Sequence, residues 1–496
     1  MTTYNEWQDK AKSIEFITKA FINGEFVPSI SGETLSSINP ATGEVLAEVA
    51  SCSAEDADIA VEAAKNAFNS GVWSRMPNAE RKKILLKLAD LIEENLEKFS
   101  LIDTLDMGKP ISDCVLFDVP TTIDTFRWSA EAIDKVYGQI SPNMNNSLAL
   151  ITREPVGVVA AIVPWNYPLM MAAWKVAPAL AAGNCVVLKP SEKSPLSVLL
   201  LAKLAKQAGV PDGVFNVLPG YGHTVGKALA LHNDVQTIAF TGSSKIAGQL
   251  MQYAGQSNMK RTWLEAGGKS PCIIFADCED LEAAAFSAAF GIFSNQGEVC
   301  IATSRLIIEE SIKDDFLPLL LEQAKKFLPG DPLNPDTLMG ALVDTSHLEK
   351  VLAYIEAGKK EGAELLLGGE STEVNGKGCY VKPTIFTDAK QDMSIIQEEI
   401  FGPVLAISTF TEWEEAIELA NDSIYGLAAG VWTSNLKKAH KTVRELQAGM
   451  VWVNNWAGSD ATMPFGGVKQ SGNARDKSIY SLEKYTDLKS TWIDLN

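Results

Sequence analysis

The sequence predicts an α/β protein in which parallel strands alternate with helices. Short runs rich in apolar and β-branched residues occur at 156–163, 185–188, 215–218 and 237–240. Helical segments such as 195–208 separate these runs, and the alternation restarts after residue 266. Strands that alternate with helices form parallel βαβ units whose helices cover both faces of the sheet. With 496 residues, the chain is too long for one compact core, so two or three domains are expected.

The region before the first strand is expected to be helical. Ser53 and Asp56 have the spacing of a helix N-cap, and the residues after them are apolar at helical intervals. A second apolar stripe has Lys and Glu on its opposite face, as in a helix packed against a core; it consists of Ile84, Leu88, Leu91, Ile92 and Leu96.

The second half of the chain predicts another α/β unit. Strands are expected at 271–275 and 305–308, with an Ala-rich helix near 281–294 between them. The tail 481–496 alternates apolar and polar residues near its end, which is typical of an edge strand that needs a partner, for instance from another subunit.

Composition excludes several classes of function. The net charge of −19 disfavours nucleic acid and anionic membranes as partners. No secretory signal and no apolar run of the roughly 18 residues that span a bilayer is visible, so a cytoplasmic protein is expected. The seven cysteines are widely spaced without a CxxC pair, and the four histidines are scattered, so neither a disulfide framework nor a metal site is expected.

The segment NQGEVCIATSR (295–305) contains the candidate nucleophile, Cys300. Small neighbours let a substrate approach, and Gly297 permits a tight backbone turn. A reactive cysteine needs partial exposure and a lowered pKa, whereas a buried structural cysteine is the commoner role.

Two further polar residues are candidates, one between predicted elements and one directly after a predicted strand. Glu265 in WLEAGGKSP precedes a Gly pair and suits a general base, the alternative being a solvated turn residue. Asn166 in PWNYP follows the strand 156–163, where ligands of open α/β sheets bind. Its amide suits an oxyanion donor, although Asn is also common in turns.

Two motifs are candidate dinucleotide contacts by themselves, and a third is not. KPSE (189–192) follows a strand and offers Lys189 and Glu192 for ribose hydroxyls. FTGSSKIAG (240–248) leads from a strand into a helix, whose first N–H groups bind pyrophosphate, although it lacks the full GxGxxG pattern. EEIFGPV (398–404), taken alone, is only an acidic turn.

The order and spacing of these motifs are more specific than any of them singly. PWN, KPSE, FTGS, LEAGGKS, GEVC, EEIFGP and PFGGVKQSG follow one another over roughly 300 residues. The set closely resembles the aldehyde dehydrogenase superfamily, and the resemblance extends from FINGEF near the start to LEKYTDLKS near the end.

This resemblance implies a catalytic role for four residues. Cys300 is the implied nucleophile, Glu265 the general base, Asn166 the oxyanion donor, and Lys175 the family's lysine in the AWK segment behind the site. The implied cofactor is NAD, with NADP also accepted. Its implied contacts are Val163, Pro164, Trp165, Lys189, Ser191, Glu192, Thr241, Gly242, Ser243, Gly267, Glu399 and Phe401.

The resemblance also implies a domain plan and an oligomer. A Rossmann-like NAD domain would comprise 1–128 and 151–265, an α/β catalytic domain 266–478, and a small β oligomerisation element 129–150 and 479–496. The family usually forms homodimers or homotetramers.

The implied mechanism begins with attack of the Cys300 thiolate on an aldehyde. Hydride transfer leaves a thioester, which Glu265-activated water hydrolyses to the acid. Relatives that transfer the thioester to coenzyme A generally lack this base. A carboxylate at Glu192 would repel a 2′-phosphate and favour NAD, while Lys189 would soften that preference.

The substrate channel is expected to be aromatic and acidic. Its implied lining is Tyr167, Trp174, Trp456, Phe465, Asp118 and Asp460. Such a lining suits an amino-aldehyde or another polar ω-substituted aldehyde. For each Asp a solvated surface position is the commoner role, and no basic residue is expected in the channel.

A narrower resemblance points the same way. WQDKAKS, EAIDKVYG, SNMKRTWLEAGGKS, GIFSNQGEVCIA and GVKQSGNARDKS are similar to the bacterial γ-glutamyl-γ-aminobutyraldehyde dehydrogenases of putrescine breakdown. Asp476 departs from the Glu of many relatives, and Ala247 stands where the FTGS loop often has Gly.

Other functions stay open at this point. Betaine-aldehyde, semialdehyde or broad-specificity aliphatic aldehyde dehydrogenases are the alternatives within the family. A cysteine hydrolase would need a His beside Cys300. A structural protein that has lost turnover would be expected to lack Cys300 or Glu265, and both are present.

Overall fold

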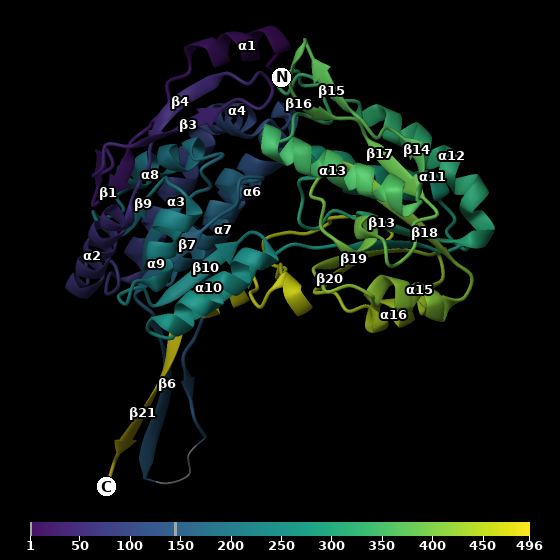
Figure 1. Cartoon of the computed structure of the whole chain (residues 1–496). Coiled ribbons are helices and arrows are strands. Elements are labelled where there is room, and N and C mark those ends of the chain that lie inside the picture. Colours follow the sequence, from purple (N-terminus) through teal and green to yellow (C-terminus); the bar gives the residue numbers. More distant parts are fainter. Residues whose placement is uncertain (1, 143–145) are drawn as a thin grey trace.

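Two seven-stranded sheets form the framework of the computed structural model, which describes residues 2–142 and 146–496. Figure 1 shows the sheets in two separate bodies, with a narrow β arm projecting from the N-terminal one. The α/β fold class expected from the alternating strands and helices is confirmed. No described helix is both long and apolar enough to cross a membrane.

The N-terminal sheet has the strand order β11-β10-β7-β8-β9-β1-β2. Four of its strands are parallel and fully buried: β7 (Val158–Ile162), β8 (Cys185–Lys189), β9 (Phe215–Val217) and β10 (Thr237–Thr241). The parallel β11 (Arg261–Glu265) ends the sheet on the far side of β10, and its first residues are partly exposed. The antiparallel β1 (Ala20–Ile22) and β2 (Glu25–Val27) complete one edge. Strands buried on both faces are continuous apolar runs, which is why the sequence pattern revealed them.

Helices pack around this sheet and around one another. They are α2 (Ala54–Ser70), α3 (Asn78–Glu94), α4 (Leu96–Met107), α6 (Val119–Ala132), α7 (Pro168–Ala181), α8 (Leu196–Ala208), α9 (Lys227–Leu231) and α10 (Ser244–Gln256). Ser53 caps α2 as predicted, because its hydroxyl accepts from the backbone of Asp56 while the Asp56 carboxylate accepts from the Ser53 N–H. The helix α1 (Tyr4–Ser13) and the hairpin β3 (Thr34–Ile38) and β4 (Val45–Ala50) precede this layer.

The second sheet has the order β14-β17-β18-β13-β12-β19-β20. Its strands are β12 (Pro271–Ile274), β13 (Arg305–Glu309), β14 (Glu364–Leu367), β17 (Thr384–Thr387), β18 (Val404–Phe410), β19 (Ala428–Trp432) and β20 (Met450–Val453). All pair in parallel except β14. The main helices of this body are α11 (Leu281–Phe293), α12 (Lys313–Ala324), α13 (Thr345–Glu361), α15 (Trp413–Asn421) and α16 (Leu436–Glu445).

The projecting arm joins distant parts of the chain. The C-terminal β21 (Thr486–Asp494) pairs antiparallel along its whole length with β6 (Ser147–Pro155), and β6 also pairs with β5 (Gln139–Ile140). The tail is therefore an edge strand, as expected, and its partner on one side comes from its own chain. Large apolar side chains on β21, including Leu488 and Trp492, are exposed.

Candidate active site

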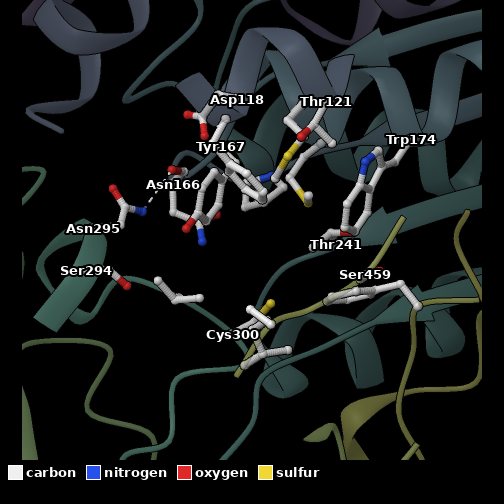
Figure 2. A pocket seen from close by; sticks show the side chains of 18 of the residues that line it. Asp118, Thr121, Asn166, Tyr167, Trp174, Thr241, Ser294, Asn295, Cys300 and Ser459 are labelled. Atoms are coloured by element: carbon white, nitrogen blue, oxygen red, sulfur yellow. Dashed lines mark hydrogen bonds between the residues drawn. The ribbon is translucent and has the colours of Figure 1, made fainter. Parts of the chain in front are cut away.

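A cavity of about 780 Å³ is lined by residues from both bodies of the protein. One side is formed by the turn after β7 and by α6 and α7, which belong to the N-terminal body. The other side comes from the loop after α11 and from segments around Glu399 and 450–465. Figure 2 shows Asn166, Tyr167 and Trp174 facing Cys300 across this space.

Cys300 is partly buried in the cavity wall, at the end of a tightly wound loop. Asn295, Gln296 and Gly297 have consecutive positive φ angles of 45°, 56° and 73°. A Cβ on Gly297 would lie 2.3 Å from the carbonyl of Gly402, so this position admits only glycine. The loop thus presents the sulfur to the cavity from a strained backbone.

The electrostatic surroundings of Cys300 oppose spontaneous ionisation. Burial, followed by the charges of Glu399 and Glu265, raises the pKa of the thiol to about 12. The thiolate therefore has to form with help, through a base that takes the proton or a positive charge that approaches the sulfur.

The side chain of Asn166 is held in place beside this loop. Its Nδ2 donates to the main-chain oxygen of Glu298 at 2.7 Å, and Asn295 Nδ2 donates to the Asn166 carbonyl at 3.2 Å (Figure 2). A primary amide carries two N–H groups, so one stays available for a ligand in the cavity. Asn166 and Cys300, separated by 134 positions in sequence, line the same cavity.

Glu265, the predicted base, ends β11 but does not line the cavity as the structure stands. It is buried, and neither carboxylate oxygen has a hydrogen-bond partner among the described residues. A Cβ on Gly466 would lie 2.7 Å from its Oε1, so the side chain is turned toward that glycine. Burial, with a smaller effect from Asp476, raises the pKa of Glu265 well above its usual value.

Lys175 lies behind the site in a buried charge cluster. Asp476 pairs with both Lys175 and Lys484, and all three side chains are almost inaccessible to solvent. Although burial acts to raise the pKa of Asp476, the two ammonium groups hold it below the usual value. The shorter Asp at this position thus contacts both lysines directly.

Eight of the twelve cofactor candidates line the cavity, and the part of the wall that they form is called the cofactor end. They are Pro164, Trp165, Thr241, Gly242, Ser243, Gly267, Glu399 and Phe401. Ser243 caps α10, since its hydroxyl accepts from the Ile246 N–H at 3.4 Å. Thr241 Oγ1 is buried without a hydrogen-bond partner among the described residues. Ala247 is buried within α10, so the helix continues through the position where relatives often have Gly.

Glu399 is fixed by the Gly pair that follows Glu265. Gly268 N–H donates to Glu399 Oε1 at 3.1 Å. A Cβ on Gly267 would lie 2.1 Å from Oε2, so only glycine allows this approach. Phe401, with φ of 61°, packs edge-on against Trp165 at 5.3 Å.

The remaining cofactor candidates lie at the ends of β7 and β8, outside the cavity lining. Val163 N–H donates to the carbonyl of Lys189 at 3.1 Å, and Lys189 Nζ pairs with Glu192 Oε2 at 2.8 Å. Ser191 Oγ accepts from the Lys193 N–H at 3.3 Å. The structure thus places these four residues at the same sheet edge but not in the cavity wall.

All six candidate substrate residues line the cavity: Tyr167, Trp174, Asp118, Trp456, Asp460 and Phe465. Trp174 and Phe465 pack with ring centroids 4.8 Å apart, and Trp456 Nε1 donates to the Ile301 carbonyl at 3.3 Å. These contacts hold an aromatic wall beside Cys300.

Two expectations about charge in the channel are wrong. Asp118 was expected to add free negative charge, but it is buried and paired with Lys109, which also lies 3.7 Å from the centre of the Tyr167 ring. No basic residue was expected, yet Lys477 lines the substrate side of the cavity. Asp460 is exposed in the same loop region, where its Oδ1 accepts from Thr462 N–H at 2.7 Å.

Sequence reasoning also missed His347, Lys193 and Lys350 in the cavity wall. His347 Nε2 lies 2.7 Å from the Phe401 carbonyl and 3.6 Å from Glu298 Oε1. Burial lowers the pKa of this imidazole to about 4, so it is neutral at pH 7. No motif marked it, because it comes from the first turn of α13, far from the other segments.

The histidines do not support a cysteine hydrolase. Among the described residues that line the cavity, His347 is the only histidine, and the contact made by its Nε2 is to Phe401 rather than to Cys300. Within the described part of the chain, no group of three His, Cys, Asp or Glu residues could hold a metal ion.

Comparisons with known proteins agree with this geometry. A family model described as the aldehyde dehydrogenase family matches residues 26–491. The NADP/NAD-dependent aldehyde dehydrogenase PuuC of Escherichia coli (strain K12) is 53% identical over 489 residues, which cover 99% of this chain and 98% of PuuC.

Two solved structures superpose along their full length. An indole-3-acetaldehyde dehydrogenase (AldA) of P. syringae, solved with NAD⁺ and IAA, is 58% identical with a TM-score of 0.99, and 100% of each chain is covered. The γ-glutamyl-γ-aminobutyraldehyde dehydrogenase of Burkholderia cenocepacia J2315 is 53% identical with a TM-score of 0.98 and the same coverage.

Proposed function

Because the chain belongs to the aldehyde dehydrogenase family, we propose that it uses NAD to oxidise a polar ω-substituted aldehyde, such as an amino-aldehyde or a γ-glutamylamino-butyraldehyde, to the acid. The observation that carries this proposal is that Cys300, Asn166 and Glu399 share one cavity. A nucleophile, an oxyanion donor and a carboxylate for a ribose are the groups that the reaction requires.

The residues at one end of the cavity fit a dinucleotide. Thr241 Oγ1 is buried without a partner among the described residues, the capped N-terminus of α10 is adjacent, and Gly267 leaves room for Glu399. Ser243 and the α10 N-terminus would hold the pyrophosphate, and Glu399 a ribose. When bound, the nicotinamide supplies the hydride acceptor.

The chemistry at the sulfur follows from the side chains around it. The Cys300 thiolate attacks the aldehyde carbon, and the oxygen becomes an oxyanion that the free Asn166 N–H and the Cys300 backbone N–H stabilise. Transfer of hydride from this adduct to the nicotinamide of bound NAD would leave a thioester on Cys300. Water then attacks the thioester carbonyl, the carbon–sulfur bond breaks, and the acid leaves.

Glu265 is proposed to activate that water. Its carboxyl faces Gly466 and the Lys175–Asp476–Lys484 cluster, so it has to rotate into the cavity to reach the thioester. Its high pKa suits proton transfer, because a base that is too acidic would not take a proton from water. The buried lysines are proposed to stabilise its ionised form.

The substrate class rests on the lining residues of the cavity other than the cofactor candidates. Aromatic side chains there give apolar area for a carbon chain, and Asp113, Asp124 and Asp460 bring polar groups to the lining. An aromatic aldehyde is a second candidate. It is favoured by Tyr167, Trp174 and Phe465 on one wall and by the similarity to the indole-3-acetaldehyde enzyme.

The proposed setting is a homodimer or homotetramer in the cytoplasm. The outer edge of β21 carries exposed apolar residues that a second copy of the arm would cover. All seven cysteines are free, which suits a reducing compartment.

A panel of aldehydes tested with NAD and NADP decides the proposal. The panel contains γ-glutamylamino-butyraldehyde, 3-aminopropanal, indole-3-acetaldehyde, betaine aldehyde and hexanal, scored by kcat/KM from NADH formation. Preference for the first two supports the proposed class. Preference for indole-3-acetaldehyde selects the second candidate, and equal rates on all five contradict any polar selectivity.

A further inference from the structure

Lys477 occupies an unusual backbone position at the substrate side of the cavity. Lys477 and Ser478 have φ angles of 59° and 53°, a left-handed conformation that costs free energy for residues other than glycine. The surroundings enforce it: Asp476 exchanges two backbone hydrogen bonds with Phe465, and Ser478 N–H donates to the Ala461 carbonyl at 2.8 Å. The strained turn directs the lysine into the cavity wall.

The ammonium of Lys477 forms no ion pair with a carboxylate of the described residues. Its Nζ donates to Ser459 Oγ at 2.6 Å and lies 5.7 Å from the centre of the Trp174 ring. No carboxylate of the described residues lies within the 4.0 Å of an ion pair, although Asp460 is near enough to stabilise the charge. An ammonium has three N–H donors, so two stay free for a ligand.

The other two lysines of the cavity wall differ from Lys477, one by its ion pair and the other by its place in the cavity. Lys193 pairs with Asp344 at 2.6 Å, and Lys350 Nζ lies 3.5 Å from the main-chain oxygen of Glu399, at the cofactor end. Ser459 and Trp174, the neighbours of Lys477, face each other at one side of the cavity in Figure 2. Among the described residues, Lys477 is therefore the lysine that lines the cavity away from the cofactor end and has no ion pair.

We propose that Lys477 is a specificity-determining residue that binds a carboxylate at the distal end of the aldehyde substrate. The proposal deepens and rests on the proposed function. A simple amino-aldehyde or indole-3-acetaldehyde offers no carboxylate to Lys477, whereas the γ-glutamyl group carries one beside its ammonium. Burial lowers the pKa of Lys477, which means that its charge is partly desolvated and gains more from an anionic partner than a surface lysine does.

The test compares aldehydes of matched length with and without a distal carboxylate. Glutarate semialdehyde and pentanal have the same chain length, and γ-glutamylamino-butyraldehyde is compared with its α-carboxamide. In Lys477→Met, the ratio of kcat/KM for the charged over the neutral aldehyde should fall at least tenfold, mainly through KM. Lys477→Arg, which keeps the charge, should retain the ratio within about threefold.

Lys437→Met, a change at an exposed lysine on α16, serves as the control and should leave the ratio at the wild-type value. Added salt should lower the ratio of the wild type but not that of Lys477→Met. An unchanged ratio in a folded Lys477→Met enzyme would overturn the assignment while leaving aldehyde oxidation intact. Failure of the proposed function is different, because the wild type would then form no NADH from any of these aldehydes.

Discussion

The side-chain amide of Asn166 donates to the main-chain oxygen of Glu298 at 2.7 Å, two residues before Cys300. This bond ties the turn after β7 to the loop that carries the nucleophile, although the two segments belong to different bodies of the protein. One contact therefore positions both the proposed oxyanion donor and the loop of the proposed nucleophile. A site of this kind is organised before the substrate arrives.

Replacing Asn166 should slow the chemical step. In Asn166→Ala, one oxyanion donor is lost, and removal of such a donor lowers kcat by about 10²–10³-fold. Stopped-flow measurement of the first NADH turnover checks this prediction, with NAD binding followed by quenching of protein fluorescence. Asn258→Ala, an amide that bonds main-chain oxygens on the surface, is the control. A normal first turnover in Asn166→Ala would contradict the role.

Cys300→Ala should form no NADH with any aldehyde, because the covalent adduct cannot form, while NAD still binds. Cys379→Ala removes another partly exposed thiol that does not line the cavity, and it should keep wild-type turnover. Mass spectrometry of the wild type quenched during turnover should find the acyl adduct on Cys300. Turnover in Cys300→Ala, or an adduct on a different residue, would disprove the assignment.

The sequence motifs marked most of the segments that meet in the cavity, with KPSE as an exception, but they could not give side-chain directions. Asn166 and Thr241 come together because parallel strands β7 and β10 end at the same sheet edge. Asp118 is paired rather than free because Lys109 lies beside it, and this pairing is set by tertiary packing. Lys477 was missed because its orientation follows from a left-handed backbone that a local pattern does not specify.

The same limit applies to Glu265. The motif LEAGGKS marked the residue and its Gly neighbours, and the structure explains those glycines by the approach of Glu399. The direction of the Glu265 carboxyl, however, is decided by Gly466 and by the buried cluster around Asp476, which lie about 200 positions later in the chain.

Glu265→Gln should separate acylation from thioester hydrolysis. We expect one burst of NADH per active site followed by a halt, because a glutamine cannot accept a proton from water. Because the pKa of Glu265 is raised, the ionised fraction of its carboxyl increases as pH rises toward that pKa. Steady turnover of the wild type should therefore rise with pH over the same interval. The variant should lose this dependence. The control is Glu322→Gln, which changes an exposed residue on α12 and should behave as the wild type. Steady turnover in Glu265→Gln would refute the role of Glu265 as the base.

Asp476→Asn should destabilise the protein, because it leaves Lys175 and Lys484 without their counter-charge in the interior. Breaking a buried pair costs about 3–5 kcal/mol, whereas Asp487→Asn at the exposed pair with Arg261 should cost less than about 1 kcal/mol. Thermal unfolding followed by circular dichroism compares the two. A Tm for Asp476→Asn equal to that of Asp487→Asn would show that the buried cluster contributes little.

The pH dependence of this contribution follows from the lowered pKa of Asp476. A carboxylate whose pKa is lower in the folded than in the unfolded chain stabilises the fold above the unfolded value, and this stabilisation is lost as pH falls through the folded value. The difference in Tm between wild type and Asp476→Asn should therefore be full at pH 7 and shrink in acid. A difference that grows in acid would contradict the pairing.

Glu192→Gln should shift cofactor preference toward NADP. Glu192 would face the 2′-position of the adenosine ribose, where its charge repels a phosphate, and Lys189 already offsets part of that charge at 2.8 Å. Removing the carboxylate leaves the Lys189 ammonium free to bind the phosphate, so the kcat/KM ratio of NADP over NAD should rise about tenfold, which corresponds to about 1.4 kcal/mol. Lys189→Met should lower the same ratio, because it removes the cation and leaves the repulsion. Steady-state kinetics with both cofactors at one saturating aldehyde concentration measures the two changes. Equal NADP/NAD ratios of kcat/KM in the wild type, Glu192→Gln and Lys189→Met would show that the adenosine ribose does not bind beside Glu192.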